Sequence, residues 1–229
     1  MSEYWIINLA SLSIPLLSSF HPKLKFYHRW KYWIPAIILT ALVFLVWDAW
    51  FTSAGVWWFS EQYTGNSHFL KMPAEEWAFF FCIPYACIFT YETLEKTWPV
   101  LKIRPSLLRI MGVAFIAFWL VSLVFNLGRM YTMICYGSAI AVLWVVWYSY
   151  PDILNRFIPV FLILLIPFIA VNGLLTGSFS AMEIVSYNDM QNSGIRFLRI
   201  PVEDFTYAFS LILMNLMFIR FFEELITDK

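Results

Sequence analysis

The stretches PAEE (residues 73–76) and PVED (residues 201–204) each stand directly before a long apolar run of the chain. Positions in the second motif exceed those in the first by 201 − 73 = 128, a difference that we call the motif offset, and it also relates Glu95 to Glu223. Acidic side chains at the end of a membrane helix are costly to keep, so they indicate a functional site. Because the motif recurs, we interpret the chain as one structural unit used twice.

Composition assigns the chain to the membrane. Hydrophobic residues make up 61% of it and charged residues 13%, and the mean hydropathy is +0.70. These values, with apolar runs of about 18 residues or more, are typical of an integral membrane protein. No Ser/Gly-rich linker or low-complexity tract divides the chain, so we expect residues 1–229 to form a single transmembrane domain.

Several kinds of site are disfavoured. The eight glycines form neither GxGxxG nor GxxxxGK[ST], so no nucleotide-binding motif is present. The net charge is +0, with no basic patch beyond the short loops, so nucleic acid is not an expected partner. Cys82, Cys87 and Cys135 lie in apolar runs without metal-binding spacing, which favours buried free thiols over a metal site or disulfides.

Hydrophobic runs predict seven membrane-spanning helices, each near the roughly 20 residues that cross the hydrocarbon. They cover residues 4–20, 32–51, 74–93, 106–125, 131–149, 157–175 and 202–221. With the N-terminus outside, the basic residues on the inner side are Lys23, Lys25, Arg29, Lys31, Lys96, Lys102, Arg104, Arg109, Arg156, Arg220 and Lys229, and those outside are Lys71, Arg129, Arg196 and Arg199. The positive-inside rule then predicts a multi-pass protein of the cell membrane with an outer N-terminus and a cytoplasmic C-terminus.

The predicted fold class is an all-α membrane protein with a 3+1+3 order of spans. Residues 1–95 form the first repeat, residues 96–128 contribute a linking helix, and residues 129–229 form the second repeat. The linking helix makes the repeats parallel, so we expect a pseudo-twofold axis along the membrane normal. This topology puts both acidic motifs on the outer side, with Asp48 near the first and Asn172 near the second.

Two outer loops are too aromatic and apolar for ordinary solvated segments. They are GVWWF at residues 55–59 and GIRFL at residues 194–198. One interpretation is an aromatic belt at the membrane interface, which twelve Trp and twelve Tyr make reasonable. The other interpretation is the mouth or wall of an apolar pocket.

The motif carboxyl groups have the properties of acid/base catalysts. In apolar surroundings the charged form of a carboxylic acid is disfavoured, so such a group can hold a proton near neutral pH. A neighbour that is better solvated, or paired with Arg196 or Arg199, can stay ionised and act as a base. The alternative is helix N-terminus chemistry, in which proline fits the first turn and carboxylates complement the helix dipole. Repetition of the motif favours the catalytic interpretation.

A polar stripe suggests which acids face inward. Four residues share one helical face of the last span: Glu203, Thr206, Tyr207 and Ser210. The stripe favours Glu203 as the inward-facing acid, with Glu75 as its counterpart in the first repeat. Glu76 and Asp204 would then face a loop or the other repeat.

Aromatic rings near the motifs are candidates for stabilising a cation. Ring faces attract cations within about 6 Å, and most strongly where water is absent. The candidates are Trp57, Trp77, Phe80, Phe205 and Tyr187. Taken one by one, the alternative for each of them is a packing role.

These residues resemble the integral-membrane lycopene cyclases of the carotenoid pathway, in the form that fuses two small subunits into one polypeptide. The resemblance covers nearly the whole chain and rests on the order of its motifs. In the first half these are residues 47–48, 55–59, 73–77, 79–81 and 91–92, and in the second half Asn172, Thr176, residues 184–187, Arg196 and residues 201–204.

The resemblance implies an isomerase, an intramolecular lyase that cyclises the linear ψ-ends of lycopene to β-ionone rings. A general acid would protonate the terminal double bond at C2, the polyene would close a six-membered ring on the cation, and proton loss from C6 would complete the ring. The substrate would be lycopene or a related linear carotenoid from the membrane lipid, and no cofactor or metal would be needed. The implied site has Glu75, Glu76, Glu203 and Asp204 as catalytic residues, with Asp48, Asn172, Tyr187 and Arg196 as supporting polar residues.

Two alternatives come from other classes of protein. A 3+1+3 carrier of small solutes has the same layout, but it needs a polar path on both sides of the midplane. Here the inner halves of the spans are mostly Leu, Ile, Val and Phe. A non-catalytic membrane scaffold is the third possibility, and it would tolerate Glu→Gln changes in both motifs. The sequence indicates neither the oligomeric state nor the proton donor.

Overall fold

The computed structural model describes residues 1–227. Over this part of the chain it contains seven long helices, one short 3-10 helix and six short strands. The helices are α1 (Glu3–Ser18), η1 (Phe26–Arg29), α2 (Trp30–Ala54), α3 (Ala74–Thr97), α4 (Pro105–Phe125), α5 (Met130–Ser149), α6 (Pro151–Leu175) and α7 (Val202–Thr227). The strands are β1 (Trp57–Phe59), β2 (His68–Phe69), β3 (Met72–Pro73), β4 (Val185–Tyr187), β5 (Arg196–Phe197) and β6 (Ile200–Pro201).

All seven predicted spans are helical, but the first differs from the others in length. Six helical segments, beginning at Phe26, Ala74, Pro105, Met130, Pro151 and Val202, are long and apolar enough to cross a membrane. Helix α1 has 16 residues, about 24 Å at 1.5 Å per residue, and so falls short of the roughly 30 Å hydrocarbon core. Lys229, counted above among the inner basic residues, lies outside the described residues.

A tight hairpin leads directly into each of the two helices that begin with an acidic motif. Strand β2 pairs with β3 directly before α3, and β5 pairs with β6 directly before α7. The register is the same once the motif offset is applied, since Phe69 pairs with Met72 and Phe197 with Ile200. The internal repeat thus extends from the sequence to the backbone.

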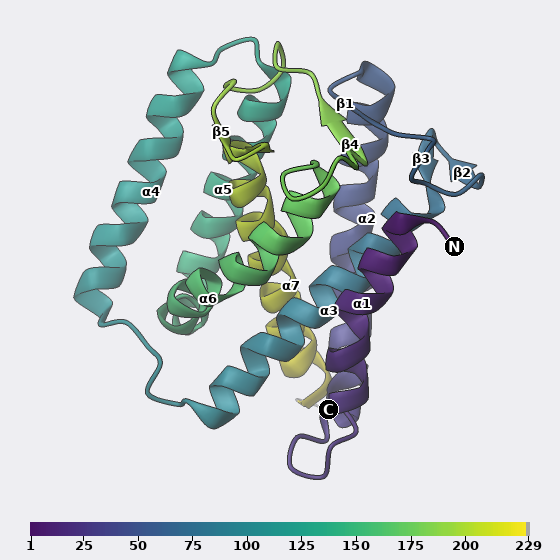
Figure 1. The fold of residues 1–229 in the computed structure, drawn as a ribbon. Coiled ribbons are helices and arrows are strands. Elements are labelled where there is room, and N and C mark those ends of the chain that lie inside the picture. Colours follow the sequence, from purple (N-terminus) through teal and green to yellow (C-terminus); the bar gives the residue numbers. More distant parts are fainter. Residues whose placement is uncertain (228–229) are drawn as a thin grey trace.

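The two halves are joined by a third antiparallel pair, β1 with β4. Trp58 lies opposite Ser186, its own counterpart at the motif offset. Antiparallel pairing of equivalent residues is what a local twofold axis between the strands produces. All six strands gather at one end of the helices, and the C-terminal end of α7 lies at the other (Figure 1).

The helices pack in a pattern that follows the repeat. Helix α1 lies along α3 and α5 lies along α7, while α2 packs against α7 from the other half. Helix α4 lies at the edge beside α5 (Figure 1). Gly112 brings these two helices close, because a Cβ there would sit 2.0 Å from the Trp147 ring.

Ion pairs connect the halves at the end opposite the strands. Arg29 contacts Glu92 and also Glu223 of the second half, with its Nη2 atom 2.6 Å from the Glu92 carboxylate. Arg156 of the second half places its Nε atom 3.3 Å from Glu95 of the first. Glu95 and Glu223 are separated by the motif offset, and the two arginines by one position less. Each half therefore supplies an arginine to a glutamate of the other.

We predict that Arg156→Glu lowers the free energy of unfolding by about 2 kcal/mol, between the values for exposed and buried pairs. The Arg156 side chain is only 6% exposed, so the substitution buries a like charge beside Glu95. Adding Glu95→Arg should restore at least half of the loss. Thermal unfolding of the detergent-solubilised protein measures both effects, with the exposed Arg109→Glu as control. A double variant no more stable than the single one would contradict the pairing.

Candidate active site

An apolar cavity of about 270 Å³ lies between the two halves, near the end that carries the strands. Three carboxyl groups line it, those of Asp48, Glu76 and Asp204. On α3 its lining extends from Glu76 to Thr90, about 21 Å along the helix axis. On α6 it extends from Asn172 to Phe161. The carboxyl groups therefore occupy one end of an elongated space with otherwise mainly apolar walls.

The first half contributes a pair of carboxyl groups, on Asp48 of α2 and Glu76 of α3. The two groups lie within hydrogen-bonding reach of one another. The Tyr4 hydroxyl donates to Glu76 Oε2, and the Tyr207 hydroxyl donates to Asp48 Oδ1 over 3.3 Å. Asp48 Oδ2 is buried and has no partner among the described hydrogen bonds.

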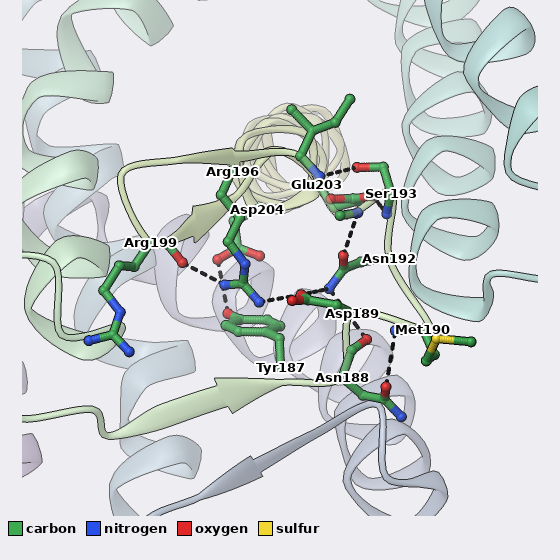
Figure 2. A network of polar contacts seen from close by, with 12 residues as sticks. Tyr187, Asn188, Asp189, Met190, Asn192, Ser193, Arg196, Arg199, Glu203 and Asp204 are labelled. Carbon is green, nitrogen blue, oxygen red and sulfur yellow. Dashed lines mark hydrogen bonds and ion pairs between the residues drawn. The ribbon is translucent and has the colours of Figure 1, made fainter.

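The second half contributes one carboxyl group, on Asp204 of α7. Asp204 accepts three hydrogen bonds from the Tyr131 hydroxyl, the Asn172 amide at 3.0 Å and the Tyr187 hydroxyl at 2.9 Å (Figure 2 shows the last). Tyr131 is the counterpart of Tyr4, one position short of the motif offset. The two halves therefore present the same acid-plus-tyrosine unit to one cavity.

Glu75 and Glu203 are not part of the described lining of this cavity, and they are bound in matching ways. Glu75 Oε1 accepts from the Ser2 hydroxyl and from the Gly65 backbone N–H at 2.7 Å. Glu203 Oε1 accepts from the Thr132 hydroxyl at 2.6 Å and from the Ser193 backbone N–H at 2.6 Å. Both side chains thus tie a helix start to the loop that precedes it (Figure 2 shows Glu203 and Ser193).

The expectation that Glu203 and Glu75 are the inward-facing acids is therefore wrong, because Glu76 and Asp204 line the cavity. That expectation was drawn from the polar stripe on α7. At the start of that stripe Glu203 meets α5, where the Thr132 hydroxyl binds its side chain and Cys135 Sγ donates to its carbonyl. Whether Glu75 and Glu203 act in catalysis stays a prediction.

The candidate aromatic residues separate into two groups. Trp57 lines the cavity, with its ring centroid 5.3 Å from that of Tyr131. Trp77 packs on Phe69, and Phe205 packs on Phe168 of α6. Phe80 is buried in the core beside Phe44. Of the five predicted rings, Trp57 and Tyr187 belong to the described lining of the cavity.

The two aromatic loops also differ in where they lie. Trp57 and Phe59 of the first loop line the cavity, which confirms the pocket interpretation for residues 55–59. In the second loop Phe197, the counterpart of Phe69 at the motif offset, is exposed in the β5–β6 hairpin. For residues 194–198 the pocket interpretation is therefore not supported.

Arg196 lies outside the described lining of the cavity and contacts Tyr187, which lines it. Its guanidinium lies 5.7 Å from the centroid of the Tyr187 ring and donates to the Asp189 carboxylate (Figure 2). Hydrogen bonding from Arg196 holds the pKa of Asp189 below its usual range. Burial raises the pKa of the Tyr187 phenol well above its usual range, so the phenol stays protonated and donates to Asp204.

Three tyrosines complete the site, and none of them is in the predicted set. Tyr4, Tyr131 and Tyr207 all line the cavity and donate to its carboxyl groups. The repeat contains a signal for two of them, because Tyr4 and Tyr131 stand at nearly equivalent positions of the two halves. Over residues 1–227, no group of three or more His, Cys, Asp and Glu is placed to hold a metal ion.

We predict that Glu75→Ala and Glu203→Ala each destabilise the protein by about 2 kcal/mol, because each leaves a partly buried backbone N–H and a hydroxyl without an acceptor. The Gln variants keep an acceptor oxygen and should lose less. Thermal unfolding of the purified proteins checks this. Alanine variants that unfold at the same temperature as the wild type would exclude the anchoring role.

Comparison with known proteins gives one match. A family model described as lycopene cyclase matches residues 2–94 and 128–222, which are the two halves without the segment that contains α4. No curated protein and no solved structure matches the chain.

Proposed function

This chain belongs to the lycopene cyclase family, and we propose that it acts as a lycopene β-cyclase. The proposed reaction converts the linear ψ-ends of lycopene to β-ionone rings, through γ-carotene to β-carotene, without net redox change. The observation that carries the proposal is the cavity, which joins carboxyl groups from both halves to long apolar walls. A hydrocarbon that needs acid catalysis requires both features.

The proposed chemistry is proton addition followed by proton loss. A carboxylic acid gives its proton to C2 of the ψ-end, which leaves a cation at C1. The C5–C6 double bond attacks C1, so the C1–C6 bond forms and the positive charge moves to C5. A carboxylate then takes the proton from C6, and the electron pair of the broken C6–H bond forms the C5–C6 double bond. One proton enters and one leaves, as an isomerisation demands.

Aromatic groups near the acids suit the cationic intermediate. Trp57, Tyr131 and Tyr187 contact one another with ring centroids 5.3 to 6.0 Å apart. All three line the same cavity as Asp204. We propose that their ring faces stabilise the cation while the apolar walls keep water from capturing it.

The proposed architecture is 3+1+3, with parallel repeats around a pseudo-twofold axis. The matched segments, the equivalent hairpins and the self-equivalent β1–β4 pairing support it. We also propose a multi-pass location in the cell membrane, with the strands and carboxyl groups on the outer side and the C-terminus in the cytoplasm. The distribution of Lys and Arg supports this orientation.

The small-solute carrier is the weaker candidate. A carrier needs polar groups along a path through the protein. Below the carboxyl groups, this cavity is lined by residues such as Ile83, Leu164 and Phe168. That lining favours a hydrocarbon over a polar solute.

We predict that cells accumulating lycopene turn from red to orange-yellow when they express the protein, with monocyclic and bicyclic carotenes in the extract. Chromatography with absorbance spectra identifies the rings. Cells that stay red, with the protein present in their membrane, would contradict the proposal. Uptake of a sugar or another small solute into reconstituted vesicles would favour the carrier instead.

We also predict that Ala86→Phe lowers the yield of cyclised product about tenfold or more. Ala86 lines the cavity about 15 Å along α3 from Glu76, so a larger side chain blocks the space for the polyene. The control is Ala114→Phe on the exposed face of α4. Equal yields of cyclised product from Ala86→Phe and Ala114→Phe would show that the substrate does not occupy this part of the cavity.

A further inference from the structure

We propose that the two halves divide the acid/base work: Asp48 and Glu76 share the proton that is given to the substrate, and Asp204 is the ionised carboxylate that removes the proton from C6. The inference rests on the proposed cyclase function and deepens it. It assigns a catalytic role to Asp48 and separates the roles of Glu76 and Asp204. The two half-sites share the same acid-plus-tyrosine unit, so their differences carry the argument.

The contact between Asp48 and Glu76 indicates that they hold a proton. Two carboxyl groups form a hydrogen bond only when one of them is protonated, and like charges this close repel strongly in an apolar site. Among the described residues no Lys or Arg forms an ion pair with either group. A shared proton is therefore the arrangement that satisfies this pair.

The buried oxygen Asp48 Oδ2 supports the same conclusion. It has no donor among the described hydrogen bonds, although Oδ1 accepts from Tyr207. A bare buried oxygen is costly on an ionised carboxylate. Glu75 and Glu203 also have one, but only Asp48 has a second carboxyl group of the cavity within hydrogen-bonding reach with which to share a proton. The pair can therefore hold one shared proton at the edge of an apolar cavity.

The surroundings of Asp204 favour the opposite state. Tyr131, Asn172 and Tyr187 all donate to its two oxygens, and three such bonds stabilise the charged form. The Arg196 guanidinium lies behind the Tyr187 ring. With three donors, against one hydroxyl donor for each acid of the pair, Asp204 is the carboxyl group best suited to be ionised beside a carbocation and to accept a proton from it.

One of the positions that distinguish the halves bears directly on the motif acids. Asp48 and Asn172 hold corresponding places on α2 and α6, and each contacts the motif acid of its own half, Glu76 or Asp204. A second carboxyl group makes the first half a proton donor, and an amide that can donate a hydrogen bond makes the second half a base. The structure assigns the asymmetry of the reaction to this difference, together with the Tyr187 donor, whose counterpart in the first half is Phe59.

The proton balance of a turnover follows. An O–H bond of the Asp48–Glu76 pair breaks as the C–H bond at C2 forms, and the pair is left ionised. Asp204 gains the proton lost from C6. Exchange with water between turnovers returns one proton to the pair and removes one from Asp204, so that no net proton is consumed.

Deuterium labelling tests the assignment. Membranes containing the full-length protein are incubated with lycopene in D₂O buffer, and mass spectrometry and NMR locate deuterium in the product and in the recovered lycopene. The variants are Glu76→Gln, Asp48→Asn, Asp204→Asn and Asn172→Asp. The amount and thermal stability of each protein in the membrane are measured alongside.

Loss of the acid and loss of the base have different signatures. Glu76→Gln and Asp48→Asn should reduce both cyclisation and deuterium at C2 of recovered lycopene by about 10² to 10⁴, the usual contribution of general acid catalysis. Asp204→Asn should reduce cyclisation by a similar factor. In that variant the pair still deuterates C2, and return of the cation to lycopene leaves deuterium at C2.

Asn172→Asp is the matched control for the position that holds a carboxyl group in one half and an amide in the other. It gives Asp204 a carboxyl partner, so the base becomes protonated, cyclisation falls at least tenfold and labelling of recovered lycopene continues. Continued labelling also shows that the Asp204 and Asn172 variants are folded and bind substrate.

Two outcomes would overturn the inference. One is labelling of recovered lycopene by Glu76→Gln or Asp48→Asn together with its loss in Asp204→Asn. The other is equal loss of labelling in all four variants while their stability is retained. Either result leaves the cyclase proposal intact if the wild type makes rings. Absence of rings from the wild-type protein would instead refute the proposed function itself.

Discussion

Buried carboxyl groups beside an apolar cavity must either receive enough hydrogen bonds or share a proton, and this constraint organises the site. Asp204 meets it with three donors drawn from α5, α6 and β4. Glu76 meets it with the Tyr4 hydroxyl from α1 and the adjacent Asp48 from α2. Helices distant in sequence must therefore converge at one end of the molecule, which is where the strands hold them.

The same constraint explains the first acid of each motif, which lies outside the described lining of the cavity. Glu75 and Glu203 are fully buried, and each accepts a backbone N–H from the loop that precedes its helix. Each loop therefore folds back over the start of its helix, and the two motifs have the same orientation relative to their hairpins. One acid of each motif, Glu75 or Glu203, fixes the loop to the helix, while the next residue lines the cavity. Two buried acids at each helix start are costly to desolvate, and these two separate roles explain why both are present.

Much of this was predictable from periodicity and repetition. Helix ends fall within a few residues of the predicted spans for α3, α4 and α5, because apolar runs of membrane length have few alternatives to helix. The correspondence of Asp48 with Asn172 was also predictable from their places in the two repeats. The inward-facing acid was not, because adjacent helical positions point about 100° apart and only the neighbouring helix decides between them. Helix α1 ends two residues before its predicted span does, and its 16 residues fall short of membrane length.

By itself, the sequence determined that the chain is a duplicated, helical membrane protein with acids at equivalent helix starts, since hydropathy and a fixed offset are properties of the chain alone. Only the tertiary structure decided that Glu76 and Asp204 share a cavity and that Glu75 and Glu203 bind loops. Only it showed that Tyr4, Tyr131 and Tyr207 donate to the cavity acids. The reason is physical: a carboxyl group's environment is set by donors from other helices, and their approach depends on packing rather than on local sequence.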